Sequence, residues 1–202
     1  MDVTNIVKEY VNKNAICMSI GEASLIAETI LSRKNSDLLI FGVGNDSSLW
    51  IDLNDGETAF IEDSYEWITT VKKKTPDINV FHIDYPRRIE EWEYLLEHTE
   101  ELKIPIPQLI SCKKWDIIFV DAPLGNYKKN NKNVPGRMYS IYMASKLIAD
   151  DGIILVHDCS RKIENAYSNK FIGKKYLENE IVKGSYKGGV LRKYVIKKES
   201  AQ

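Results

Sequence analysis

The 202-residue chain has few cysteines, and their spacing suits neither a metal site nor a set of disulfides. Cys17, Cys112 and Cys159 are odd in number, widely spaced, and include no Cys-x-x-Cys pair. Isolated thiols of this kind are typical of proteins kept in a reducing compartment. The sequence therefore argues against a disulfide-rich secreted domain, and we expect a cytoplasmic protein.

Long apolar runs and an excess of one charge are also missing. The 28 basic and 29 acidic side chains give a net charge of −1, which offers no electrostatic ground for binding nucleic acid or an anionic membrane. No stretch approaches the roughly 20 apolar residues that a membrane span needs. The first eleven residues lack the apolar run of a signal peptide. We expect no nucleic-acid partner, no membrane span and no leader.

The composition that is present, with 44% hydrophobic and 28% charged residues, is that of an ordinary globular domain. Two helical patterns, at residues 5–11 and 19–32, come first. Ser19 followed by Glu22 has the spacing of a capping box at the start of the second helix. We predict that residues 1–35 form a helical cover within the same domain as residues 36–202.

From Asp37 onward, short apolar runs alternate with helical stretches. Strands are predicted at residues 38–43, 58–61, 80–83, 115–120 and 153–156, with helices at 65–74, 89–100 and 138–150. This alternation is typical of a parallel sheet with helices on both faces. Two further strands, at 176–182 and 190–196, flank a glycine-rich reversal and predict an antiparallel hairpin. The pattern as a whole predicts an α/β protein with the Rossmann-like fold of class I methyltransferases.

The first strand ends in a glycine-containing turn, Gly42-Val43-Gly44-Asn45-Asp46-Ser47. Glycines at these two positions allow a sharp turn and a close approach of the backbone to a ligand. Ser47 stands where a dinucleotide fingerprint has its third glycine, and no Gly-Lys-Ser/Thr follows, so a phosphate-binding P-loop is not expected. The turn favours a nucleotide-like ligand, although a plain strand-to-helix turn would look similar.

The second strand ends in Glu62 and Asp63. A carboxylate at this place can accept hydrogen bonds from both hydroxyls of a ribose. The alternative is that an acid here caps the helix that starts near Tyr65. We assign Glu62 to the ribose and the cap to Asp63 or Ser64, and we keep Asp63 as a second candidate cofactor-binding residue.

Asp121 ends the fourth strand, and His157 with Asp158 ends the fifth. Because the carboxyl ends of parallel strands meet at one edge of a sheet, these three side chains are expected to lie together. Such a group can act on a substrate hydroxyl as a general base, or its two carboxylates can hold a divalent cation. A lone histidine is more often a hydrogen-bonded core residue, but two acids beside it favour a catalytic role.

The segment 124–135 joins the fourth strand to the helix that begins near Arg137. Its glycine, proline, lysines and Tyr127 are typical of a loop that covers a cleft. Arg137 is a candidate for a bidentate clamp on a substrate carboxylate, with a surface ion pair as the alternative. We therefore name Tyr127 and Arg137 as candidate substrate-binding residues.

Five strings of the sequence together resemble one family. They are LLIFGVGNDSSLW (38–50), FIEDSYEW (60–67), WDIIFVDAPLG (115–125), PGRM (135–138) and VHDCSRKIE (156–164). With the intervening residues they cover the chain from about 19 to 196, and they resemble the glucuronoxylan 4-O-methyltransferase family. This is the plant polysaccharide-biosynthesis domain that includes the irregular-xylem proteins.

The resemblance implies methyl transfer from S-adenosylmethionine to the 4-hydroxyl of glucuronic acid, assisted by a divalent cation. It implies that residues 36–202 bind the methyl donor through Gly42, Gly44, Asp46, Ser47 and Glu62. We add Asn45, from the same turn, as a candidate cofactor-binding residue. Asp121, His157 and Asp158 would form the reaction centre, Asp121 and Asp158 would hold the cation, and Arg137 would face the acidic sugar.

The chain also departs from the plant proteins. It lacks their membrane anchor and the insertion before the fourth strand, has Asn45 in place of a histidine, and has a longer basic loop at 128–133. The acceptor is therefore left open between a uronic acid, another sugar, and a small-molecule amine or hydroxyl. Two further alternatives are an NAD-dependent oxidoreductase, which the missing third glycine disfavours, and an inactive cofactor-binding partner protein.

Overall fold

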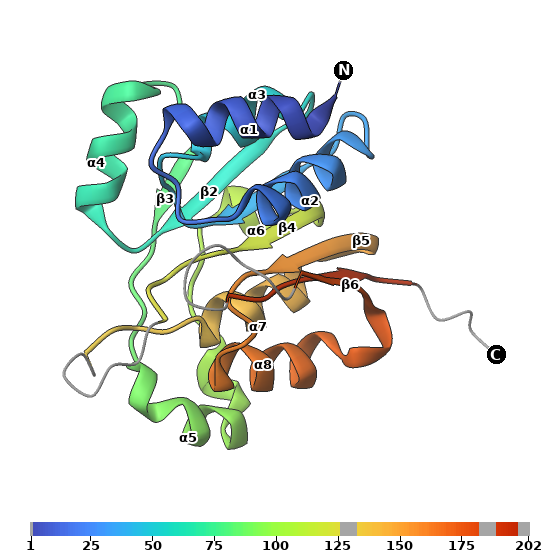
Figure 1. The fold of residues 1–202 in the computed structure, drawn as a ribbon. Helices are drawn as coiled ribbons and strands as arrows, with labels where there is room; N and C mark the ends of the chain where they lie inside the picture. The colour runs from blue at the N-terminus through green and yellow to red at the C-terminus, as the bar shows by residue number, and fades with distance from the viewer. Residues whose placement is uncertain (1, 126–132, 182–188, 198–202) are drawn as a thin grey trace.

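A seven-stranded sheet forms the centre of the computed structural model, which describes residues 2–125, 133–181 and 189–197 (Figure 1). The strands are β1 Leu38–Phe41, β2 Thr58–Glu62, β3 Val80–His82, β4 Trp115–Val120, β5 Ile148–Val156, β6 Leu177–Ile181 and β7 Leu191–Val195. Their order is β3-β2-β1-β4-β5-β7-β6. Strands β1 to β5 are parallel, whereas β7 is antiparallel to both β5 and β6. The predicted parallel sheet with an antiparallel hairpin is confirmed.

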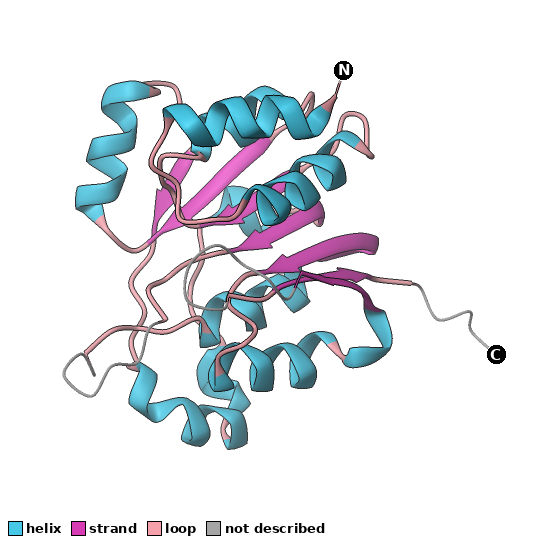
Figure 2. Ribbon diagram, in the orientation of Figure 1, coloured by secondary structure: helices cyan, strands magenta, loops and turns pink. Residues whose placement is uncertain are grey.

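Helices cover both faces of this sheet, which Figure 2 shows as a magenta layer between them. They are α1 Val3–Lys13, α2 Ile20–Leu31, α3 Ser47–Leu53, α4 Tyr65–Lys74, α5 Trp92–Glu97, α6 Gln108–Ser111, α7 Met138–Leu147 and α8 Lys162–Tyr167. Alternate residues of β1 face opposite sides, as a strand's two-residue period requires. Leu38 and Ile40 pack with the core under α1 to α4, while Leu39 and Phe41 pack with the core under α5 to α8. The continuous apolar run at residues 38–43 reflects this burial on both faces.

The N-terminal helices pack on the sheet rather than standing apart from it. Val7 of α1 and Ile26 of α2 belong to the same hydrophobic cluster as Ile40 of β1. The predicted capping box is present, because the Glu22 N–H donates to Ser19 Oγ at 3.1 Å and the Ser19 N–H donates to Glu22 Oε2 at 2.9 Å. Among the described residues, no helix has both the length and the apolar character needed to cross a bilayer.

Two predicted boundaries differ from the structure, and a short helix is present that was not predicted. The stretch 89–100 is not one helix: a 3-10 turn at Ile89–Glu91 precedes α5, and His98, with φ −110° and ψ 64°, separates α5 from a second 3-10 turn at Thr99–Leu102. Helix α7 ends at Leu147, and β5 begins at once with Ile148. Helix α8 was not predicted. Its six residues are too few to show a helical period.

Candidate functional site

A cavity of about 910 Å³ lies at the carboxyl ends of the parallel strands. The ends of β1, β2, β4 and β5 all contribute to its wall, as the crevice rule for open α/β sheets predicts. Segment 15–18 and helix α2 close it from the N-terminal side. Of the candidate residues, the cavity is lined by Gly42, Gly44, Asn45, Asp46, Glu62, Asp63, Asp121, Arg137, His157 and Asp158. Tyr127 lies outside the described residues.

The turn after β1 depends on its first glycine. Gly42 has φ +115°, a conformation that side chains rarely adopt, and a Cβ there would lie 2.9 Å from the Cβ of Ala122. Its N–H donates to the carbonyl of Ile61 at 2.8 Å, which ties the turn to β2. Ser47 is buried and does not line the cavity; its Oγ accepts from the Gly44 N–H at 2.9 Å. Ser47 therefore shapes the turn rather than contacting a ligand.

Two acids at the end of β2 face this turn. The Glu62 carboxylate accepts hydrogen bonds from the Val43 N–H at 2.9 Å and the Ser64 N–H at 2.8 Å. Burial raises the pKa of Glu62 to about 7 and also raises the pKa of Asp63. Ser64, not Asp63, provides the N-cap of α4. Asp63 and Glu62 thus both remain available to a ligand in the cavity, with Glu62 fixed by the backbone.

Asn45 and Asp46 occupy different positions in the wall. Asn45 joins the turn to the N-terminal cover, since its Nδ2 donates to the Ala15 carbonyl at 3.0 Å. Its own carbonyl accepts from Tyr10 Oη at 2.7 Å. Asp46 also lines the cavity, and burial together with the charge of Asp121 raises its pKa to about 6. The sequence did not indicate that α1 would be hydrogen-bonded to the turn.

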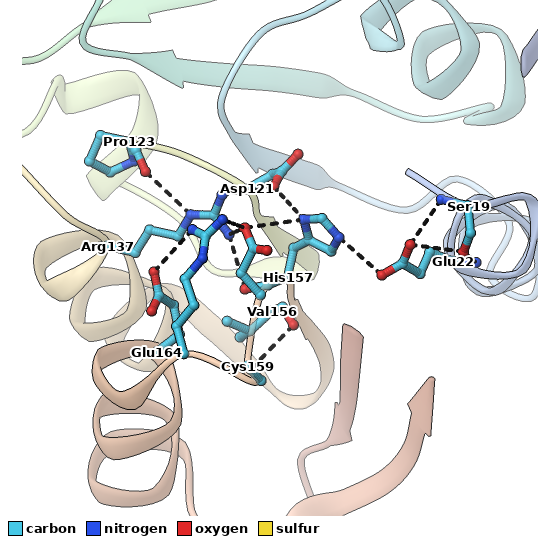
Figure 3. A network of polar contacts seen from close by, with 11 residues as sticks. Ser19, Glu22, Asp121, Pro123, Arg137, Val156, His157, Cys159 and Glu164 are labelled. Atoms are coloured by element: carbon cyan, nitrogen blue, oxygen red, sulfur yellow. Dashed lines mark hydrogen bonds and ion pairs between the residues drawn. The ribbon is translucent and has the colours of Figure 1, made fainter. Parts of the chain in front are cut away.

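The predicted group of Asp121, His157 and Asp158 is brought together in the wall of the cavity, and Figure 3 shows Asp121 beside His157. His157 Nδ1 lies 2.8 Å from Asp121 Oδ1 and 3.6 Å from Asp158 Oδ2. The three side chains offer potential ligand atoms within 4.8 Å of one another. Asp158 has φ +62°, a left-handed conformation that aspartate tolerates better than most residues and that often marks functional sites.

Glu22 of α2 is a further member of this group that the sequence did not reveal. One carboxylate oxygen, Oε2, completes the capping box, while Oε1 lies 3.1 Å from His157 Nε2. Figure 3 shows the resulting chain from Ser19 through Glu22 to His157 and Asp121. The capping pattern explains Glu22 fully at the level of sequence, and nothing local points to a histidine 135 residues away.

His157 has carboxylates at both ring nitrogens. Burial alone would lower the pKa of His157, but the carboxylates of Asp121, Glu22 and Asp158 outweigh it and raise the pKa to about 10. The imidazole is therefore a cation with two donated hydrogen bonds. It has no free nitrogen with which to accept a proton, and it serves to orient and stabilise Asp121.

Arg137 has a different position from the one its sequence suggested. Its side chain is 6% exposed, and its guanidinium contacts Asp121 Oδ1 and Asp158 Oδ2, each at 3.0 Å. It also donates to the carbonyls of Pro123 and His157. With four partners inside the protein, Arg137 is not an open clamp for a substrate carboxylate. It holds the two acids apart and neutralises them.

Arg161 had no predicted role of its own, yet its side chain is more exposed than that of Arg137. Its side chain is 32% exposed and lines the cavity, and its Nη2 contacts Asp158 Oδ2 at 2.9 Å. Trp67 of α4, half exposed, adds an aromatic wall close to Asp63. Trp67 lies on α4 and Arg161 directly precedes α8, and at such positions sequence spacing says little about which cavity a side chain will face.

Carboxylates outnumber cations around the cavity. Among the described residues, six acidic side chains line it, namely Glu22, Asp46, Glu62, Asp63, Asp121 and Asp158, against Arg137, His157 and Arg161. A low-dielectric cleft lined by an excess of one sign favours ligands of the other. The cavity is suited to a cationic ligand and unsuited to the pyrophosphate of a dinucleotide.

Comparison with known proteins agrees with this geometry. The sequence profile of the IRX15/IRX15L/GXM family matches residues 21–111 and 102–185. The chain belongs to this family. This chain is 30% identical to glucuronoxylan 4-O-methyltransferase 3 of Arabidopsis thaliana, over 89% of its own length and 67% of the length of that protein. It is 31% identical to arabinogalactan O-methyltransferase 2 of the same plant, over 81% of the chain and 64% of that protein.

A solved structure shows the same fold at low sequence identity. The TehB-like SAM-dependent methyltransferase of Corynebacterium glutamicum superposes with a TM-score of 0.53 at 12% identity, covering 85% of this chain and 87% of that one. The predicted family and the class I methyltransferase fold are confirmed, and the similarities agree with the predicted methyltransferase class. The chain spans about two thirds of the length of these two plant relatives.

Proposed function

We propose that the protein is an S-adenosylmethionine-dependent O-methyltransferase whose acceptor is a hydroxyl of a uronic acid or another sugar in a glycan. The observation that carries the proposal is that one acid-rich cavity joins the glycine turn and Glu62 to the Asp121 carboxylate. A donor held at the turn would therefore face a candidate base across the same cavity. The relatives named as glycan O-methyltransferases support the choice of acceptor.

The residues present fit the methyl donor. Gly42 and Gly44 line the cavity with backbone and no side chain, which allows a close approach of a ligand, and the cavity volume lies within the range usual for small-ligand sites. Glu62 and Asp63 would accept hydrogen bonds from the ribose hydroxyls, and the surplus carboxylates would attract the positive charge of the sulfonium. When bound, the donor supplies an electrophilic methyl group on sulfur.

Asp121 is the group that can take the acceptor's proton. Its side chain is 30% exposed, against 9% for His157 and 12% for Asp158. Burial by itself would raise the pKa of Asp121, but the charges of His157 and Arg137 outweigh it, so the carboxylate is ionised. As the acceptor oxygen bonds to the methyl carbon and the carbon–sulfur bond breaks, the hydroxyl proton becomes strongly acidic and passes to Asp121.

The test is methyl transfer from labelled S-adenosylmethionine to four acceptors. These are a glucuronate-bearing xylan oligosaccharide, an arabinogalactan oligosaccharide, free glucuronate and a small primary amine. We expect label in a uronate-bearing glycan. Label in the amine alone would contradict the sugar acceptor, and the acid-rich cavity gives that second candidate, a cationic amine, its physical basis. Label in none of them would favour a protein that binds the donor without catalysis.

Substitution of Glu62 by glutamine should weaken binding of S-adenosylhomocysteine. The variant keeps the shape of the side chain but loses charge-assisted hydrogen bonds to the ribose, so we expect a Kd about 10-fold higher. Because the ionised carboxylate is the better acceptor, donor affinity in the unmodified protein should fall as the pH drops through about 7, the pKa of Glu62. Calorimetric titrations from pH 6 to 8 measure both effects. A pH dependence that persists unchanged in Glu62→Gln would refute the assignment.

We also propose a divalent cation as an auxiliary at Asp121 and Asp158. Hydrogen bonds within the described residues engage Oδ1 of Asp121 and Oδ2 of Asp158, which leaves one oxygen on each acid for a largely hydrated ion. His157, with both nitrogens engaged, does not fit as a ligand. Asp121 Oδ2 has two lone pairs, so it could contact such an ion with one and take the acceptor's proton with the other. The ion would supply positive charge beside the acceptor oxygen, as Arg137 does from the protein side.

Chelation tests this cation separately from the donor. We expect EDTA to lower turnover and added Mn²⁺ or Mg²⁺ to restore it, while binding of S-adenosylhomocysteine stays unchanged because the donor residues lie on β1 and β2. If neither treatment changes turnover, the proposed cation is wrong, and Arg137 and His157 are the positive groups of the site.

From the sequence alone we further propose a cytoplasmic location.

A further inference from the structure

A second cavity of about 440 Å³ adjoins the first. Arg161 lines both of them, so one guanidinium forms a shared wall. The rest of the second cavity comes from Glu90 in the 3-10 turn before α5, the start of α5, the start of α8 and Gly125. None of these residues has a part in the methyl transfer described above.

Two buried polar groups in this wall have no hydrogen-bond partner among the described residues. Glu164 of α8 is fully buried, and neither of its carboxylate oxygens is hydrogen-bonded; the same holds for Nη1 of Arg161. The two groups lie 3.7 Å apart, too far for a good hydrogen bond. Leaving both unsatisfied is costly, so a bound group between or beside them would be stabilised.

The chemistry of the two groups selects a hydroxyl. Glu164 can accept a hydrogen bond, and Arg161 Nη1 can only donate one. A hydroxyl does both, so a sugar hydroxyl can donate to the carboxylate while accepting from the guanidinium. An ionised carboxylate ligand would satisfy only the guanidinium, because it has no hydrogen to donate to Glu164. The pair therefore favours a neutral polyol over a second acidic sugar.

The remaining walls suit the body of a sugar ring. Trp92 is half-buried and presents an aromatic surface on which the C–H face of a pyranose can pack. Lys162, at the mouth, lies with Nζ 4.7 Å from the ring centre of Trp92 and is largely exposed, so it can move aside. A Cβ at Gly125 would lie 2.3 Å from Glu164 Oε1, so only glycine fits beside this carboxylate.

We propose that the second cavity is a subsite for a neutral sugar unit next to the sugar that is methylated. The inference rests on the proposed glycan O-methyltransferase function, and it adds that the acceptor is an oligosaccharide rather than a free monosaccharide. Trp92 contacts the ring face, and Glu164 with Arg161 Nη1 binds its hydroxyls. Arg161, as the common wall, lies between the two sugar positions.

Binding of two glycans tests the subsite without requiring turnover. A glucuronate-bearing xylo-oligosaccharide and free glucuronate are titrated calorimetrically into the protein, with and without S-adenosylhomocysteine. We expect the oligosaccharide to bind at least about 10-fold more tightly. Trp92→Ala should remove most of that advantage while leaving the affinity for free glucuronate within about twofold. Tyr94→Ala, which removes an exposed aromatic side chain from the same helix outside the cavity, is the matched control.

Two further variants address the polar pair. Gly125→Ala and Glu164→Gln should each weaken binding of the oligosaccharide without weakening binding of free glucuronate. If both leave it unchanged, the pair holds solvent only and the subsite is disproved. Equal affinities for the two glycans, no binding of the oligosaccharide, or equal weakening of both probes by Trp92→Ala would also overturn it. Failure to bind S-adenosylhomocysteine would instead contradict the proposed function, and the titrations without it would still report on the subsite.

Discussion

Substitution of Asp121 by asparagine is expected to lower kcat about 10²- to 10⁴-fold, the range typical of losing a general base. Asparagine keeps an oxygen that can accept from His157 Nδ1 and Arg137 Nη2, so the surrounding hydrogen bonds can persist. What it removes is the ionised carboxylate that takes the hydroxyl proton. Initial rates of methyl transfer, measured at saturating donor, report the change.

Binding of S-adenosylhomocysteine and thermal stability separate this effect from general damage. We expect the Kd for the product in Asp121→Asn to stay within a few-fold of the unmodified protein, because the donor residues lie at β1 and β2. Asp52→Asn, at an exposed position of α3 outside the cavity, is the matched control and should keep full activity. An Asp121→Asn variant with near-normal kcat would exclude Asp121 as the base.

Substitution of Arg137 by methionine should destabilise the protein by about 3 kcal/mol and also abolish most activity. The physical reason is that the carboxyl groups of Asp121 and Asp158 would lose the buried guanidinium that contacts both. Methionine preserves much of the volume, so cavity formation contributes little. Urea denaturation followed by circular dichroism measures the change in the free energy of unfolding.

The role of Arg137 is decided by measuring both the stability and the KM of the Arg137→Met variant. An open clamp on the acceptor would raise KM for a uronate with little change in stability, whereas a buried counter-ion changes stability first. Arg87→Met is the control, since Arg87 also contacts two carboxylates, Glu91 and Glu101, but at the surface, where screening by water makes such pairs weak. A fully stable Arg137→Met variant with a raised KM would instead support the role first predicted from the sequence, in which Arg137 binds the carboxylate of the acceptor.

The centre of the sheet could be predicted because its strands β1 and β4 are buried on both faces. Residues 38–43 and 115–120 read as unbroken apolar runs, and the glycine-rich reversal before residue 190 marked the hairpin. Helix ends were less predictable. His98 breaks the stretch 89–100 through its backbone conformation, and no residue type in that stretch forces such a break. The start of β5 at Ile148 was hidden by two aspartates that form the exposed beginning of the strand.

The site was predictable where chemistry follows directly from a strand end. Gly42, Glu62, Asp121 and His157 could be placed in one crevice because parallel strands bring their carboxyl ends together. Contacts from helices and from distant segments could not be inferred in this way. Glu22 already had a complete explanation as a cap, and its second partner depends on how α2 lies across the sheet.

The direction of the Arg137 side chain was likewise beyond the sequence. Its position at the start of α7 suits an outward clamp and an inward counter-ion equally well. The choice depends on Asp121 and Asp158, which reach it from two different strand ends. Burial of an arginine between two acids depends on how the folded elements pack, and it cannot be inferred from sequence spacing.

Calorimetric titration with S-adenosylhomocysteine tests most directly whether the turn after β1 and the acids ending β2 hold an adenosyl group. We expect one molecule to bind per chain, with weaker binding to Glu62→Gln and no comparable binding of NADH. Absence of binding by both S-adenosylmethionine and S-adenosylhomocysteine to the folded protein would contradict this account of the cavity.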